Sequence, residues 1–301
     1  MQGGSFRSWW GGELTDAEWA RLEPHLPRNV GRGRRWKSHR RVVDGILFRL
    51  RTGIPWRDLP TRFGSWETVY ERHRRWSADG TWERMLRAVQ ADADAEGRID
   101  WLMVSVDSTV CRAQQHAAGA RRKAPRNPGT RIRSAQHRPD EGLGRSRGGL
   151  TTKIRLAGEG GLRPPALLVT PGQSGDAPRM IPVLDRVRVP RPAGGRPRTS
   201  PGHLSGGKAY GSRRNHRCLR RRHIKPTIPE RRDQRTHRRN RDSKGGRSTD
   251  FNHAQHARPN EVERTINRIG GSRTVATRHN KRAYVCHGTV TVAALRRWLR
   301  P

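Results

Sequence analysis

The chain has 301 residues, enough for one small and one larger domain, and carries 64 Lys and Arg against 26 Asp and Glu, a formal net charge of +38. Such an excess indicates a polyanionic partner, with nucleic acid the first candidate, although a GC-rich coding bias also raises Arg content. The three cysteines are far apart, which argues against a disulfide framework and a cysteine zinc site, and no apolar run approaches the roughly 18 residues of a membrane span. The start of the chain also lacks a signal-peptide pattern, so we expect a protein of the reducing cytoplasm with no membrane partner.

The segment 14–98 predicts a bundle of four helices. Thr15 and Glu18 form a capping box, and the apolar residues after them recur at spacings of three and four, as on one helical face. The second helix is expected to stop at Gly53, shortly before a proline. The expected N-terminal caps, in chain order, are Thr15, Ser38, Ser65 and Thr81. Residues 1–13 are predicted to be a disordered extension ahead of this module.

The third predicted helix has a basic face and follows a turn-rich link, as the second helix of a helix-turn-helix does. Arg72, Arg74 and Arg75 are therefore candidate DNA contacts, with His73 on the same stretch. The alternative is a solvated basic face on a structural helix. The tryptophans of this module are expected to pack its core rather than stack on bases. They are Trp36, Trp56, Trp66, Trp76 and Trp82.

At residue 101 the pattern changes from helical to extended. The predicted strands are 101–109, 150–158, 165–172 and 203–206, and the predicted helices after them are 260–269 and 289–299. Strands followed by helices imply an α/β core over 99–301, with a basic loop at about 117–148. The basic stretches 120–148 and 186–250 are expected to add little core. Asp107 ends the first strand, where a carboxylate is costly to bury without a cation or hydrogen bonds, so it is a candidate ligand. The alternative is a solvent-exposed Asp at a strand end.

Four consecutive blocks follow from Asp107 onward: DSTVCRAQQHAAGARRK, GRSRGGLTTKIRLAGEGG, VTPGQSGDAPRMIPVL and RVPRPAGGRPRT. They resemble, in this order, blocks of DDE-type insertion-sequence transposases of the "insertion sequence five" family. The helical module of that family is similar to two earlier blocks, LTDAEWARLEPHLP and RTGIPWRDLPTRFGSWETVYERHRRW. The resemblance therefore runs from about Leu14 to the C-terminus.

The resemblance implies a ribonuclease-H-like mixed-sheet core in which three carboxylates bind two divalent metal ions for DNA cleavage and strand transfer. Oxygen ligands of this kind suit Mg²⁺ or Mn²⁺. Carried over by motif, the first carboxylate is Asp107 in DST and the third is Glu263 in NEVERTINR. The same resemblance implies double-stranded DNA as the partner, both transposon ends and target, together with a homo-oligomer and a bacterial, nucleoid-associated location.

The second carboxylate position departs from the family pattern. There the family has an apolar strand leading into Asp-Lys-Ala-Tyr, whereas this chain has LSGGKAY, with Gly207 immediately before Lys208. A glycine offers no ligand, and the two-metal arrangement depends on a bridging carboxylate, so we expect impaired catalysis. Asp233 and Asp242 lie too far along the chain to take over. Lys208 remains a candidate DNA contact.

The helix predicted to carry Glu263 also departs from the pattern. The family has Tyr seven residues before this glutamate, Arg four before and Lys seven after. This chain has, at those positions, His256, Pro259 and Gly270. Arg264 and Arg268 remain on the expected helix as candidate phosphate contacts.

Three functions fit this sequence. The first is a DNA transposase by descent with an incomplete metal site. The second is a non-enzymatic DNA-binding remnant of a transposase, which occupies element ends. The third is a basic RNA-binding protein, which accounts for the charge but leaves the ordered motif blocks unexplained.

Overall fold

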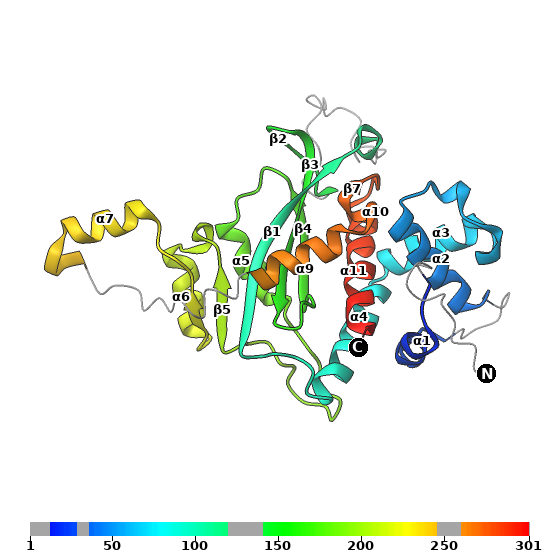
Figure 1. Ribbon diagram of the computed structural model, residues 1–301, viewed down its shortest axis with the longest axis horizontal. Helices are drawn as coiled ribbons and strands as arrows, with labels where there is room; N and C mark the ends of the chain where they lie inside the picture. The colour runs from blue at the N-terminus through cyan, green and yellow to red at the C-terminus, as the bar shows by residue number, and fades with distance from the viewer. Residues whose placement is uncertain (1–12, 29–35, 120–140, 246–259, 301) are drawn as a thin grey trace, which may run out of the picture.

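A computed structural model describes residues 13–28, 36–119, 141–245 and 260–300. Figure 1 shows the N-terminal helices at one side, a mixed sheet in the middle and helix α7 projecting at the other side. An N-terminal helical module followed by an α/β core is the fold class that the sequence predicts. Residues 1–12 of the predicted extension, most of the loop 117–148 and Pro259 lie outside the described residues. No helix within the described ranges is long and apolar enough to cross a membrane.

The N-terminal module consists of four α-helices and short 3-10 turns. The α-helices are α1 (Asp16–Leu22), α2 (His39–Thr52), α3 (Trp66–Ala78) and α4 (Thr81–Ala95). The capping box of α1 is confirmed: the Glu18 backbone N–H donates to the Thr15 hydroxyl at 3.2 Å, and the Thr15 N–H donates to the Glu18 carboxylate at 2.9 Å. Helix α2 ends as expected at Gly53, whose φ of 73° is a left-handed conformation that glycine adopts without a steric cost.

Replacing Thr15 with Ala is expected to lower the free energy of unfolding by about 1 kcal/mol, because one backbone N–H at the start of α1 loses its acceptor. Chemical denaturation of the two proteins measures this difference. Thr68→Ala is the matched control, since Thr68 lies inside α3, where Ala has the higher helix propensity. Equal losses from the two substitutions would contradict the capping role.

Two details of the helical module differ from the expectation. Gly80 rather than Thr81 precedes α4 as its cap, and the Asp79 carboxylate accepts hydrogen bonds from both the N–H and the hydroxyl of Thr81. The link between α2 and α3, residues 53–65, contains two 3-10 turns. It is longer than the roughly four-residue turn of a helix-turn-helix, so the likeness to that motif rests on the helices and not on the turn.

The core is one mixed sheet with β1 at its centre. Its strands are β1 (Met103–Ala113), β2 (Gly144–Ser146), β3 (Gly149–Glu159), β4 (Ala166–Pro171), β5 (His203–Gly206), β6 (Lys225–Thr227) and β7 (Thr277–Arg278). On one side of β1 lies β3, which is antiparallel to it and pairs in turn with β2 and β4. On the other side β5 and then β6 run parallel to β1. This is the ribonuclease-H-like arrangement that the resemblance implies.

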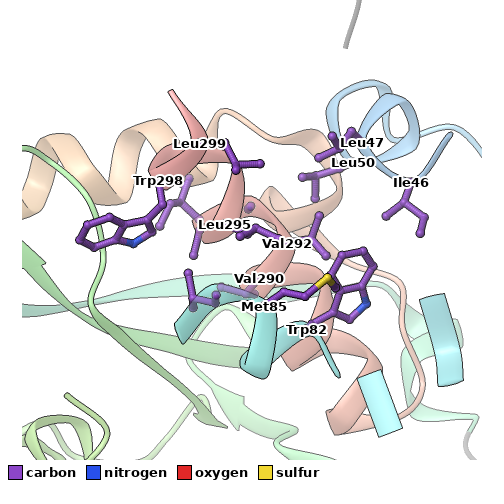
Figure 2. Close-up of a cluster of buried hydrophobic side chains, with 14 of the residues drawn as sticks. Ile46, Leu47, Leu50, Trp82, Met85, Val290, Val292, Leu295, Trp298 and Leu299 are labelled. Atoms are coloured by element: carbon purple, nitrogen blue, oxygen red, sulfur yellow. The ribbon is translucent and has the colours of Figure 1, made fainter. Parts of the chain in front are cut away.

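A single hydrophobic cluster joins the N-terminal module to the C-terminal helix. Helix α11 (Ala283–Leu299) packs against both α3 and α4 and begins earlier than the predicted residue 289. Figure 2 shows side chains of α2, α4 and α11 meeting in this cluster, among them Leu50, Met85 and Leu295. The last helix of the chain is therefore part of the core of the first module, so the boundary near residue 98 does not divide two separate cores.

A second cluster lies under the parallel strands and corrects the expectation that residues 186–250 add little core. Its buried members from that stretch are Val187, Leu204, Tyr210, Leu219, Ile224 and Ile228. They come from β5, from the helix α6 (Arg213–Arg221) and from the segments that flank β5 and β6, and they share the cluster with residues of α5 (Met180–Asp185). Within 186–245, the larger apolar residues of this Arg-rich stretch are buried, while most of its arginines are exposed. Three elements complete the chain: α7 (Arg232–Asn240), α9 (Asn260–Gly270) and α10 (Arg273–Ala276).

Candidate active site

Asp107 and Gly207 occupy neighbouring positions, the first on β1 and the second immediately after the parallel strand β5. In the register of the sheet, Val106 of β1 pairs with Gly206 of β5. The next residue along β1 is Asp107, and the next residue beyond β5 is Gly207, where the chain turns into the 3-10 helix Lys208–Tyr210. The structure thus places the first expected carboxylate beside the position at which the second is missing.

Helix α9 brings Glu263 to the same place. It packs across β1 and β3, as Figure 1 shows. Gly158 of β3 permits the close approach, because a Cβ on this residue would stand 3.3 Å from the Thr265 hydroxyl and 3.6 Å from Val262 of α9. Glu263 itself is exposed on α9, and its charge acts on Asp107, as the pKa of that residue indicates.

Burial raises the pKa of the half-buried Asp107 above its ordinary value. The negative charges of Glu263 and Asp176 raise it further, while a hydrogen bond from the Ser108 backbone and the positive charge of Lys153 lower it. The effects that raise the pKa prevail, so the ionised form of Asp107 is not fully compensated by its surroundings.

The third carboxylate near Asp107 is Asp176, to which the sequence interpretation assigned no role. The Asp176 carboxylate accepts hydrogen bonds from Lys153 Nζ at 2.8 Å, from Arg155 Nη1 at 2.6 Å and from the Ser108 hydroxyl at 2.9 Å. Burial alone would raise the pKa of Asp176, but the hydrogen bonds from Lys153 and Ser108 and the charges of Lys153 and Arg155 outweigh it and hold the pKa below its ordinary value. Asp176 is therefore already paired with two cations.

The backbone does not require glycine at position 207. Gly207 has φ −65° and ψ 166°, an extended conformation open to any residue, and it is exposed. A Cβ built there would meet no other atom within 4 Å, whereas at the neighbouring Gly206 it would stand 3.1 Å from the Tyr210 ring. The fold around position 207 could accept an aspartate as it stands.

The residues present do not fit a two-metal site. Across the described part of the chain, no group of three or more His, Cys, Asp or Glu side chains is placed to hold a metal ion. Asp107 and Glu263 supply carboxylate oxygens, Gly207 supplies none, and Asp176 is held by Lys153 and Arg155. The chemistry that two bridged metal ions perform on a phosphodiester therefore lacks part of its ligand set here.

The other predicted site residues divide into exposed and buried ones. Lys208, Arg264 and Arg268 are exposed, the first beside Gly207 and the other two on α9. Arg74 and Arg75 of α3 are exposed as well, and Arg74 forms an ion pair of 2.8 Å with Glu71.

Arg72 is a correction to the predicted DNA-contacting set, because its side chain is buried. Its guanidinium lies over the Trp36 ring at 4.5 Å and over the Trp76 ring at 5.3 Å, and it contacts the His39 ring at 3.0 Å. His73 is buried too and meets the Thr289 hydroxyl of α11 at 3.1 Å. The basic stretch of α3 therefore has two residues turned inward and two turned outward.

Comparison with known families gives two matches along the chain. Residues 102–292 match the family described as "Transposase DDE domain", which is more than half of the chain. Residues 14–86 match the family described as "Putative transposase of IS4/5 family". The second match covers the helical module and the first covers the sheet with α9 and most of α11.

Two individual relatives each match more than a third of the chain. An uncharacterised protein of Sinorhizobium fredii, y4sN, is 40% identical over 110 residues, 36% of this chain and 83% of that protein. An uncharacterised 16.2 kDa protein of insertion element IS402 from Burkholderia cepacia is 38% identical over 122 residues, 38% of this chain and 80% of that protein. Among solved structures, a Mos1 transposase paired-end complex with left transposon end overlaps with 81% of this chain and 80% of that chain, at 11% identity and a TM-score of 0.24. A similarity this weak adds no evidence for the fold beyond the strand order of the sheet.

Proposed function

We propose that this chain, which belongs to the family of transposases with a DDE domain, is an insertion-sequence transposase that binds double-stranded DNA. We propose further that it has lost one of the carboxylates required for cleavage. The observation that carries this proposal is the register of β1 and β5. It places Gly207 directly beside Asp107, with Glu263 acting on the same carboxylate from α9. A ligand set of this kind suits Mg²⁺ or Mn²⁺ when it is complete.

The DNA-binding part of the proposal rests on charge around the carboxylates. Three exposed cations lie near these positions. Lys208 directly follows Gly207, and Arg264 and Arg268 lie on α9, the helix that carries Glu263. Positive side chains around a phosphodiester-binding site attract the DNA backbone and hold it in register. Arg74 and Arg75 on α3 are a second proposed contact, on the helical module.

The affinity for duplex DNA is expected to fall steeply with salt, with a slope of log affinity against log salt of about −0.9 for each phosphate contacted. Arg264→Ala should reduce the magnitude of that slope by about one, because one counterion-releasing contact is lost. Fluorescence anisotropy of a labelled duplex across a range of salt concentrations measures both. Arg191→Ala is the control, since Arg191 is equally exposed but lies in the loop between α5 and β5. An unchanged slope in Arg264→Ala, or an equal change in Arg191→Ala, would remove α9 from the interface.

Fluorescence anisotropy with other probes separates this function from an RNA-binding one. A transposase by descent should prefer duplex DNA carrying the ends of its own element over other duplexes and over RNA of the same length. A protein that bound RNA at least as tightly, without preference among duplexes, would fit the basic RNA-binding function instead. A DNA-binding remnant that competes with an intact relative for element ends, or joins it in mixed oligomers, is the non-enzymatic form of the proposal. Because duplex DNA is its proposed ligand, we also propose that the protein associates with the bacterial nucleoid.

A further inference from the structure

A cavity of about 770 Å³ lies between the helical module and the core, away from the carboxylates. Its wall comes from the link between α2 and α3, from α3, from the segment after β1, and from residues 279–285 at the start of α11. Asp107 lies seven positions before Gln114, a lining residue, which is roughly 20 Å along an extended strand. The cavity is thus a separate site within reach of a nucleic-acid strand that passes Asp107.

The cavity is positively charged. Its cationic lining residues are Arg49, Arg74, Lys281 and Arg282, joined by His116 and His279. No Asp or Glu lines it among the residues that the structure describes. Arg74 and Arg282 pair with carboxylates outside the lining, Glu71 and Glu141. The wall as a whole therefore favours an anionic ligand.

Arg49 is an unusual part of this wall because it is a buried arginine, only 7% exposed. Its guanidinium lies 4.3 Å from the centre of the Trp56 ring, and its Nε has no hydrogen-bond partner in the described ranges of the chain. Burial lowers the pKa of Arg49 to about 10, so the side chain is still charged at neutral pH. A buried cation with an unused donor is costly unless a ligand completes its contacts.

Aromatic rings line the same cavity. They belong to Trp56, Trp66, Tyr70 and Tyr284. The Trp56 and Tyr70 rings lie 5.5 Å apart at an angle of 60°, and Tyr284 is 36% exposed. While Trp76 and Trp82 are buried in the core as the sequence predicts, Trp56 and Trp66 are only half-buried and border open space. Aromatic faces with cations beside them are the combination that binds unpaired bases and their phosphates.

We propose that this cavity binds one unpaired nucleotide of a DNA strand, with the base against the aromatic rings and the phosphate held by Arg49 and Lys281. The proposal rests on the proposed DNA-binding function and names a second binding site within it. The volume suits a ligand of nucleotide size and is too small for a duplex. A simple phosphate would leave the aromatic wall without a partner, so the base is part of the expected ligand.

The test compares two labelled DNA probes, a blunt duplex and the same duplex with a short single-stranded thymidine tail. We expect the unaltered full chain to bind the tailed probe about tenfold more tightly. Tyr284→Ala and Lys281→Ala should each remove most of that preference while leaving the affinity for the blunt duplex nearly unchanged. Lys225→Ala removes the same charge from an exposed residue of strand β6, outside the cavity, and should keep the full preference.

Arg49→Met separates binding from folding. If Arg49 serves the ligand, this substitution should reduce the preference for the tailed probe without lowering the thermal midpoint, because it removes an incompletely satisfied buried charge. A lowered midpoint with an unchanged preference would show that Arg49 is structural and would overturn its role in the cavity.

Three results would overturn the proposal. One is an equal affinity of the unaltered chain for the two probes. Another is an unchanged preference in both Tyr284→Ala and Lys281→Ala. A third is displacement of the tailed probe by a polyglutamate peptide as readily as by a thymidine oligonucleotide, which would make the ligand an acidic peptide. Failure to bind either probe would refute the DNA-binding function itself.

Discussion

Gly207→Asp is expected to give the chain a nicking activity on duplex DNA that depends on Mg²⁺ or Mn²⁺. The new carboxylate would stand beside Asp107, just after the end of the neighbouring parallel strand β5, and so complete a set of three with Glu263. Its Cβ would meet no atom within 4 Å, and the backbone already has an extended conformation, so the fold need not adjust. Because members of a catalytic group act as a unit, the expected gain in cleavage rate is on the order of 10⁴-fold.

Two control variants separate a ligand effect from a general effect of charge. Gly207→Asn has nearly the same shape as Gly207→Asp but lacks the negative charge, and it should remain without metal-dependent nicking. Gly270→Asp adds the same carboxylate at the end of α9, where a Cβ also has open space, but two turns away from Glu263. Nicking of labelled duplexes carrying the element ends is the measurement. Equal activity in Gly207→Asp and Gly270→Asp would contradict the assignment of position 207.

Asp176→Asn is expected to lower the free energy of unfolding by about 3–5 kcal/mol, the largest stability effect that the structure predicts. The Arg155 side chain is 1% exposed, and Asp176 is the carboxylate that its guanidinium contacts, at 2.6 Å. Removing the negative charge leaves Arg155 and the partly buried Lys153 next to each other without that compensation. A buried charge that loses its partner is far more costly than a surface ion pair.

The pH dependence of this loss has a definite sign. The pKa of Asp176 is lowered in the folded protein, so folding favours its ionised form. The contribution of Asp176 is complete above its unfolded pKa of about 4 and is lost as the pH falls through the lower folded value. Denaturation of the unaltered chain and Asp176→Asn at pH 7 and at successively lower pH measures the difference. Asp185→Asn is the control, because Asp185 is 52% exposed in its ion pair with Arg222 and should cost at most about 1 kcal/mol. A loss for Asp176→Asn no larger than that of the control would contradict the account.

The sequence predicts the elements whose apolar residues follow a clear period. The end of α2 at Gly53 and the strands β3, β4 and β5 appear where they are expected, to within a residue. Strand β1 (Met103–Ala113) continues four residues beyond its predicted end, so Asp107 lies inside the strand and not at its end. Strand β6 (Lys225–Thr227) was missed because it has three residues and little apolar character. Helix α6 (Arg213–Arg221) was missed because charged residues dominate it, although Cys218 and Leu219 are buried. Short elements in basic surroundings owe their structure to the packing around them, which no local pattern records.

The candidate active site, too, could be predicted from the sequence only in part. Motif resemblance led to Asp107, Gly207 and Glu263, and the sheet register and α9 place these positions together. It gave no role to Asp176, whose partners Lys153 and Arg155 lie about twenty residues earlier in the chain, at 23 and 21 positions. The expected DNA contact at Arg72 was wrong for a related reason: Trp36 and Trp76 enclose its guanidinium, and only the tertiary structure brings those rings together.

The most direct test of the central claim is the cleavage assay on the unaltered chain. Purified protein, duplexes carrying the element ends, and Mg²⁺ or Mn²⁺ are incubated together, with Gly207→Asp in parallel to show that the assay detects nicking. We predict that the unaltered chain binds these duplexes and leaves both strands intact. Metal-dependent nicking by the unaltered chain, abolished by Asp107→Ala, would contradict the claim that Gly207 disables this transposase.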